Sequence, residues 1–236
     1  MRSERILIDG PAGAIETVFD YPPGASEVAP RGLALVAHPH PLYGGTLDNK
    51  VAQIIAKTFV ELGYVSVRPN FRGAGASQGA HDDGNGETDD LVAVIAFAQR
   101  KLMPGHTTPA PAGAPDPTHA QASASDPTHA PASASDLPLV LAGFSFGSLV
   151  VSRVAKRVTA ERMVFVGTAV TRGKVEDVPP GTIVIHGELD DTVPLDAVLR
   201  WARPLELPVI VIPAADHFFH RRLHIIKGII MRAWKV

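Results

Sequence analysis

The chain has 236 residues, of which 45% are apolar, enough for a substantial hydrophobic core. Its net charge of −2 is close to neutral and points to neither a nucleic-acid partner nor an acidic substrate. The absence of cysteine excludes a disulfide framework, a Cys-ligated metal and a thiol nucleophile.

The start of the chain carries no sign of export. Met1 to Arg5 leads directly into a strand-like segment and lacks the apolar core of a signal peptide. The longest uncharged apolar stretch, 137–152, contains Gly, Pro and Ser and is shorter than the roughly 18 residues of a membrane span. We therefore expect a cytoplasmic protein without a membrane-spanning segment.

The first hundred residues alternate between strand-like and helix-like patterns. Residues 32–37 form a continuous apolar run, typical of a strand covered on both faces. Residues 47–62 have the apolar spacing of a helix, and Gly63 follows at the position expected for the helix C-cap. Two aspartates, Asp89 and Asp90, favour a helix start because they complement the helix dipole. The patterns predict strands at 5–9, 14–20, 32–37 and 64–68, and helices at 47–62 and 89–102.

Residues 104–136 form a low-complexity segment of Pro, Ala, Ser, Thr, His and Gly. It contains a near-exact ten-residue repeat, 116–125 and 126–135. Such a composition cannot bury enough apolar area to offset the entropy of ordering. We predict a disordered insertion in a single domain spanning 1–236, which the weak length dependence of loop closure allows. The repeat histidines His119 and His129 are interpreted as part of the low-complexity composition, without a binding role, rather than as metal ligands.

After the insertion, strand and helix patterns alternate again. Repeated βα units favour a doubly wound, mostly parallel sheet with right-handed crossovers, in the α/β fold class. The patterns predict strands at 137–142, 163–167, 182–185 and 209–212, and helices at 146–158, 195–205 and 219–234.

The strongest local motif is Gly143-Phe-Ser145-Phe-Gly147, a G-x-S-x-G sequence between a buried strand and a helix. The two glycines remove side chains where strand and helix approach each other around a strained turn. That turn presents the serine hydroxyl at the carboxyl edge of the sheet. The motif predicts Ser145 as a nucleophile.

A serine needs a base, and the base needs a carboxylate that fixes its tautomer. His217 follows the last predicted strand and can reach the same edge of the sheet. The segment after the strand ending near His186 offers three carboxylates, Glu188, Asp190 and Asp191. The order Ser, acid, His is the chain order of a known class of catalytic triad.

These segments together resemble the α/β-hydrolase superfamily, and in it a small bacterial branch of predicted serine hydrolases. The resemblance covers nearly the whole chain except the insertion. It implies that Asp190 is the acid of the triad, with Asp191 as runner-up. The matching segments are His38-Pro-His-Pro41 with Gly44-Gly45, Asn70-Phe-Arg-Gly73 with Gly75 and Ser77, the Ser145 motif, His186-Gly-x-x-Asp190-x-x-Val193-Pro194, and Asp216-His-Phe-Phe219.

Two backbone N–H groups are needed to hold an oxyanion. The first is expected at Phe146, directly after the nucleophile. The second should come from the loop 38–45, in which Pro39 and Pro41 have no N–H. The resemblance implies His40 as that donor, with Leu42 as the fallback.

Other interpretations of the same residues are less favoured. The pair His38 and His40 lacks the further ligands of a zinc site, so no metal is expected. The glycine-rich run 72–79 lacks the Lys-[Ser/Thr] of a phosphate loop and is interpreted as a turn. The basic final helix could touch an anionic membrane, but amphipathicity is ordinary for a helix packed on a core. His220 and His224 are expected on its surface.

Residues 169–181 leave no room for a helical lid. We expect an open, shallow site shaped by the loops 40–45 and 73–87, suited to acyl groups on carriers or small esters. The predicted function is a serine hydrolase that cleaves an ester or thioester through an acyl-enzyme, without a cofactor, acting on a small-molecule or carrier-bound acyl substrate. An acyltransferase, a serine peptidase and a non-catalytic binding protein remain open. A homodimer is possible, with no sequence feature to support it.

Overall fold

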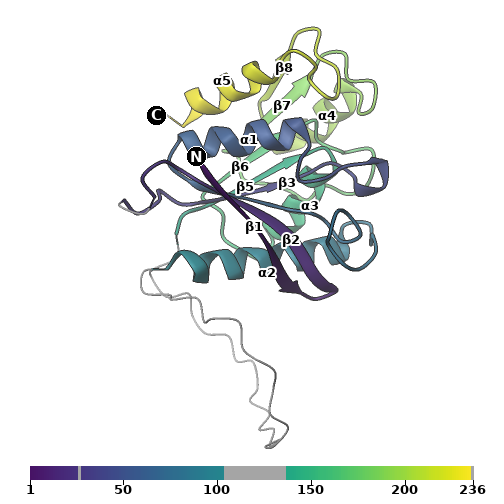
Figure 1. Ribbon diagram of the computed structural model, residues 1–236. Coiled ribbons are helices and arrows are strands. Elements are labelled where there is room, and N and C mark those ends of the chain that lie inside the picture. The colour runs from purple at the N-terminus through teal and green to yellow at the C-terminus, as the bar shows by residue number, and fades with distance from the viewer. Residues whose placement is uncertain (26–27, 104–136, 235–236) are drawn as a thin grey trace, which may run out of the picture.

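The computed structural model describes residues 1–25, 28–103 and 137–234, and these form an α/β fold around one twisted sheet (Figure 1). The predicted insertion 104–136 lies outside the described residues. The sheet has eight strands in the order β1-β2-β4-β3-β5-β6-β7-β8. The strands are β1 (Arg2–Gly10), β2 (Gly13–Tyr21), β3 (Leu33–Ala37), β4 (Val65–Pro69), β5 (Leu139–Phe144), β6 (Arg162–Val166), β7 (Ile183–Gly187) and β8 (Val209–Ile212).

The sheet is parallel from β4 to β8, as expected for a doubly wound fold. β1 and β2 form an antiparallel hairpin, and β2 also pairs antiparallel with β4. β3 and β5 lie side by side at the centre, with Leu33 opposite Leu139 and Ala37 opposite Gly143. Both central strands are fully buried, which explains their unbroken apolar sequence.

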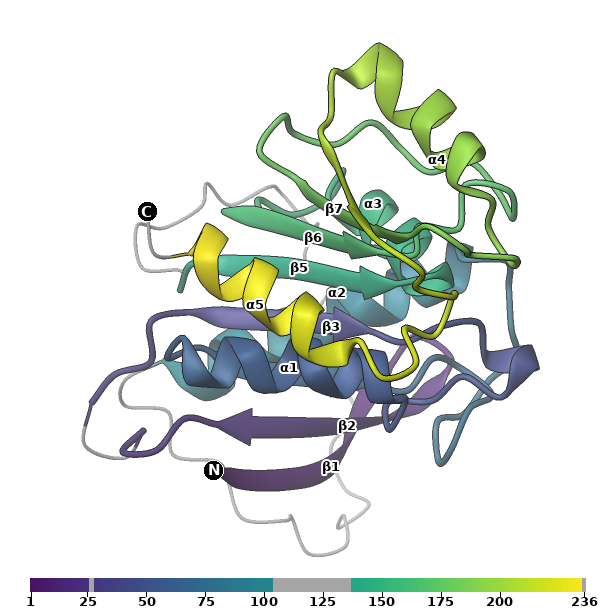
Figure 2. The ribbon, with the colours of Figure 1, turned by 90° about the horizontal axis from the view of Figure 1, so that it is seen from above.

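Helices cover both faces of the sheet (Figure 2), and the sheet divides the core in two. On one face, apolar side chains of α1 and α5 pack on alternate residues of β3, β5 and β6. On the other face, α2, α3 and α4 pack on the remaining residues of these strands. The helices are α1 (Lys50–Glu61), α2 (Asn85–Leu102), α3 (Phe146–Val154), α4 (Leu195–Ala202) and α5 (Leu223–Ala233), with short 3₁₀ turns η1 (Pro41–Tyr43) and η2 (Arg203–Leu205).

The predicted start of α2 at Asp89 is wrong, since the helix begins four residues earlier, at Asn85. Glu87 explains the difference. Its buried carboxylate accepts hydrogen bonds from the backbone N–H groups of Asp82 and Gly84, each at 2.9 Å, and so satisfies donors ahead of the first turn. Asp90 lies within the helix and binds the Arg72 guanidinium through both carboxylate oxygens.

The predicted start of α5 at Phe219 is also wrong, because the helix begins at Leu223. Phe219 and Arg221 have φ values of 53° and 62°, so the chain makes a left-handed turn there and cannot be helical. His220 therefore precedes the helix. It is exposed, and its backbone N–H donates to Asp216.

The apolar side of α5 packs against the core. Ile226 and Ile230 are buried, and α5 lies beside α1 on the same face of the sheet. Lys227 extends from it to pair with Glu61 of α1 at 2.6 Å. This agrees with the interpretation of α5 as a packed helix with a cationic outer side. Among the described residues, no helix combines the length and the apolarity required to cross a membrane.

The connection between β6 and β7, residues 167–182, contains no helix, so nothing in this described stretch forms a lid. It begins at the carboxyl edge of the parallel strands, as do the loops that follow β3, β5, β7 and β8. Loops after parallel strands gather at this edge and carry the sites of open α/β sheets.

Candidate active site

Ser145 lies on a sharp turn between β5 and α3. Its φ and ψ of 53° and −118° are strained for a residue with a side chain. The turn is held by the Ser145 N–H, which donates to the Val166 carbonyl on the neighbouring strand at 2.9 Å. A Cβ on Gly147 would lie 2.3 Å from the Ala37 carbonyl oxygen, so only glycine allows the close approach of α3 to β3. The two glycines of the motif thus permit this strained serine.

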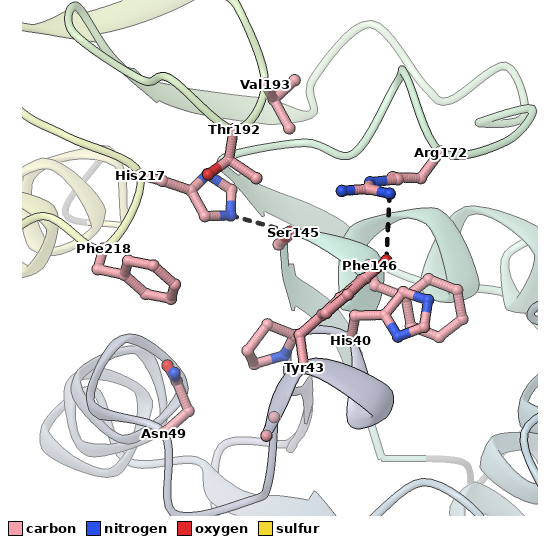
Figure 3. A pocket seen from close by; sticks show the side chains of 13 residues that line it. His40, Tyr43, Asn49, Ser145, Phe146, Arg172, Thr192, Val193, His217 and Phe218 are labelled. Carbon is pink, nitrogen blue, oxygen red and sulfur yellow. Dashed lines mark hydrogen bonds between the residues drawn. The ribbon is translucent and has the colours of Figure 1, made fainter.

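A continuous hydrogen-bonded chain runs from Ser145 through His217 to Asp190 (Figure 3). The Ser145 hydroxyl lies 3.0 Å from His217 Nε2. On the other side of the ring, His217 Nδ1 donates to Asp190 Oδ2 at 2.7 Å. The His217 ring packs on Phe144, with centroids 5.1 Å apart. Three segments that are far apart in sequence are therefore brought together as the G-x-S-x-G motif and the two following loops suggest.

Asp190 is fixed by its own loop. Its Oδ1 accepts the backbone N–H groups of Thr192 and Val193 at 3.0 and 2.7 Å, which leaves Oδ2 for His217. Behind it, His186 Nε2 donates to the Val193 carbonyl at 2.9 Å and lies 3.4 Å from Asp190 Oδ2. Burial lowers the pKa of His186, which favours a neutral ring behind the carboxylate.

The other two carboxylates that the sequence left open do not reach His217. Asp191 is exposed, with a contact of 3.4 Å to the Thr192 hydroxyl. Glu188 is also exposed and accepts the backbone N–H of Ala214 at 2.7 Å. Of the three, only Asp190 touches the imidazole.

The two residues predicted to supply the oxyanion donors are neighbours. The His40 ring packs on the Phe146 ring at 4.6 Å between centroids, and both residues line the same cavity as Ser145. The fallback residue, Leu42, uses its backbone N–H to donate to His40 Nδ1 at 3.3 Å. Phe146 is the first residue of α3, where a backbone N–H has no partner within the helix.

His38 orders this loop from beneath. Its Nδ1 lies 2.6 Å from the Pro39 carbonyl, and its Nε2 accepts the backbone N–H of Phe71 at 2.9 Å. Burial lowers the pKa of His38 to about 4, so the ring is neutral near pH 7. Both ring nitrogens are engaged with the backbone, which agrees with a structural role rather than a metal pair with His40.

The cavity above Ser145 has a volume of about 320 Å³. The loop 40–45 lines it as expected, but the described residues 73–87 do not, and that part of the prediction is wrong. His81 of this second loop instead packs behind His40, at 4.5 Å between ring centroids. The lining consists of Pro39, His40, Tyr43, Gly44, Gly45, Asn49, Ser145, Phe146, Arg172, Thr192, Val193, His217 and Phe218.

Arg172 is a charged lining residue that the sequence did not reveal. It belongs to the β6–β7 connection, whose sequence indicates only that it is too short for a lid. Its Nη1 donates to the Tyr43 hydroxyl at 3.4 Å, and the guanidinium carbon lies 5.2 Å from the centre of the Tyr43 ring. A single arginine in a short loop carries no motif that could have identified it.

Comparison with known proteins adds a family and several relatives. A model of the family described as X-Pro dipeptidyl-peptidase (S15 family) matches residues 21–178, more than half of the chain. An uncharacterized protein of Rickettsia prowazekii is 45% identical over 96 residues, which cover 41% of this chain and 39% of that protein. The chain thus spans well under two thirds of that relative's length.

Two solved bacterial structures are similar along their whole length. A serine hydrolase without a lid from Xanthomonas campestris is 30% identical, with a TM-score of 0.79 over 100% of this chain and 94% of that chain. A serine hydrolase homologue from Coxiella burnetii is also 30% identical, with a TM-score of 0.75 over 98% and 97% of the two chains. The resemblance drawn from the motifs is thereby confirmed at the level of the superfamily.

Proposed function

Because the chain belongs to the α/β-hydrolase superfamily of serine hydrolases, we propose that it cleaves an ester or thioester through Ser145. Within this superfamily it belongs to the family described as X-Pro dipeptidyl-peptidase (S15 family). The observation that carries the proposal is the hydrogen-bonded chain from Ser145 to His217 to Asp190, with distances of 3.0 and 2.7 Å. These are the contacts that a serine needs to lose its proton during attack.

In the proposed reaction, Ser145 Oγ forms a bond to the acyl carbon while its proton passes to His217 Nε2. Asp190 holds the ring and stabilises the imidazolium. The backbone N–H groups of Phe146 and His40 stabilise the oxyanion. The bond to the leaving group then breaks, and the leaving oxygen or sulfur takes the proton from His217. Water attacks the acyl-enzyme by the same path, and the acid is released.

A peptidase is the second candidate, because the family match carries that description. A dipeptidyl peptidase acts at a free N-terminus, and an ammonium group calls for a carboxylate nearby. Among the described residues that line the cavity there is no Asp or Glu, whereas there is an arginine. This charge pattern favours the ester or thioester over the N-terminal peptide.

The first test is labelling with a fluorophosphonate, which reacts with activated serines. We expect the wild type to be modified at Ser145, located by mass spectrometry, and Ser145→Ala to remain unmodified. Aryl acetate, an S-ethyl thioester and an X-Pro arylamide would then be compared as substrates. Faster turnover of the arylamide would replace the esterase proposal by the peptidase. A folded wild type that takes no label would favour a binding protein without turnover.

A further inference from the structure

Arg172 is a cation at the edge of the cavity, and no acidic partner for it is found in the part of the chain that the structure describes. Its side chain is exposed, and among the residues that the structure describes no carboxylate lies within ion-pair distance of it. Its hydrogen bond to Tyr43 uses one of five N–H donors. Most N–H donors of the planar guanidinium, whose forked geometry suits a carboxylate, are therefore available to a ligand.

No other formal cation lines this cavity among the described residues, apart from the histidines. Burial, then the neighbouring His81 and Arg172, lower the pKa of His40, which keeps its ring neutral near pH 7. With no Asp or Glu in the lining, the single charge of Arg172 makes one wall of the cavity favourable for an anion. A single charge matches a monoanionic carboxylate better than a phosphate dianion.

The backbone that carries Arg172 is held in place. The Arg172 N–H donates to the Ala169 carbonyl at 3.1 Å in a turn. A few residues later, Val175 is buried in the core, and the Glu176 N–H donates to the Ser152 hydroxyl of α3 at 3.0 Å. The guanidinium is thus presented from an anchored segment, which lowers the cost of ordering it around a ligand.

The position of Arg172 relative to the triad indicates which half of the substrate it meets. Figure 3 shows Arg172 and His217 on opposite sides of Ser145. His217 must give its proton to the leaving group, so the leaving group lies on the His217 side. The rest of the cavity, which Arg172 and Tyr43 line, is then open to the acyl group.

We propose that Arg172, assisted by the Tyr43 hydroxyl, binds a carboxylate at the far end of the acyl group, so that the preferred substrates are half-esters or half-thioesters of short dicarboxylic acids. The inference rests on the proposed acyl hydrolysis by Ser145. The bonds made and broken are those already given for that reaction, and Arg172 only positions the acyl chain. It is a specificity-determining residue rather than a catalytic one.

The test compares matched substrates that differ only at the end of the acyl chain. S-ethyl thioesters of glutaric and adipic acid are paired with their ω-amides, which have the same shape and no charge, and non-enzymatic rates are subtracted. Of the two thioesters with a free carboxylate, one will be hydrolysed faster by the wild type. We expect its kcat/KM to exceed that of the matching ω-amide thioester by about tenfold or more, mainly through a lower KM. The ratio should shrink in high salt, because the arginine is exposed.

Three variants assign the preference to this side chain. Arg172→Gln should bring the acid-to-amide ratio close to one, and Arg172→Lys should keep part of it, because the charge remains and the fork is lost. Lys174→Gln is the matched control. It removes the same charge two residues away, from a side chain that is 77% exposed and paired with Glu176, and should keep the wild-type ratio.

The outcomes separate this inference from the function on which it rests. Suppose that Ser145 is labelled and the ω-amide thioesters are hydrolysed, but the wild type shows an acid-to-amide ratio of kcat/KM near one. This result overturns only the role of Arg172. A ratio that survives Arg172→Gln does the same. An ω-phosphono thioester preferred over the acid would overturn the choice of carboxylate. If Ser145 is not labelled and neither substrate is hydrolysed, the proposed acyl hydrolysis by Ser145 is itself overturned.

Discussion

At the scale of single residues, the carboxylate that contacts His217 shows how much depends on one position. Asp190 and Asp191 are adjacent and chemically identical, and nothing in their spacing from Ser145 separates them. The loop does so, because Asp190 Oδ1 accepts the backbone N–H groups of Thr192 and Val193 and turns Oδ2 toward His217. Asp191, one residue later, points its carboxylate to solvent.

This difference predicts opposite outcomes for two neighbouring substitutions. Asp190→Asn should lower kcat by about four orders of magnitude, because the amide no longer holds the His217 tautomer or stabilises its imidazolium. Asp191→Asn should stay within about twofold of the wild type, as expected for an exposed side chain. The measurement is steady-state hydrolysis of a thioester by both folded variants. Equal losses in the two would contradict the assignment of the acid.

At the scale of elements, the boundaries show where local pattern is a poor guide. The apolar spacing predicts both α2 and α5, but each helix begins four residues away from its predicted start. In α2 the start depends on Glu87, whose carboxylate caps N–H groups upstream of it. In α5 it depends on left-handed residues that belong to the turn carrying His217. Both are features of loop geometry, which periodicity does not report.

The packing of α3 against the sheet predicts the effect of two glycine-to-alanine substitutions. Gly147→Ala should destabilise the fold by about 3 kcal/mol, because its Cβ would lie 2.3 Å from the backbone oxygen of Ala37. Gly228→Ala should stabilise it by about 0.5–1 kcal/mol, since the position is helical and nothing lies within 4 Å of the added carbon. Urea unfolding of both variants checks the signs. A neutral Gly147→Ala would mean that α3 can move away from β3 at little cost.

At the scale of the whole molecule, two buried histidines bear on stability in acid. Burial lowers the pKa of His38 to about 4 and also lowers that of His186, whereas an unfolded histidine titrates near 6.5. Between pH 6.5 and 4 the unfolded chain therefore takes up a proton at His38 that the folded chain does not. His38 therefore makes a contribution to the free energy of unfolding that falls as the pH is lowered through this window.

The prediction for His38 is a difference between two pH values. From pH 7 to pH 5, the free energy of unfolding of His38→Gln should fall by about 2 kcal/mol less than that of the wild type, because one titrating group is gone. The comparison of slopes removes any constant cost of the substitution. His224→Gln, at an exposed position on α5, is the control and should keep the wild-type slope. A His38→Gln slope equal to that of the wild type would exclude His38 as a source of the acid sensitivity.

Several features of this protein follow from its sequence alone. The alternation of buried strand and amphipathic helix predicts the doubly wound α/β fold, and the G-x-S-x-G motif between strand and helix identifies the turn at Ser145. Both succeed because they depend on neighbours within a few residues, where periodicity and turn chemistry act. The single domain of 1–236 and the nature of the insertion 104–136 stay predictions.

Other features were decided only by tertiary structure. How Asp190 is turned toward His217, which loops line the cavity, and the place of Arg172 beside Tyr43 depend on segments that the sheet order brings together. The net charge of −2 gave no reason to expect an anionic substrate, since it averages over the whole surface. A binding site responds to charges within a few ångströms, and these distances are set by the fold rather than by position along the chain.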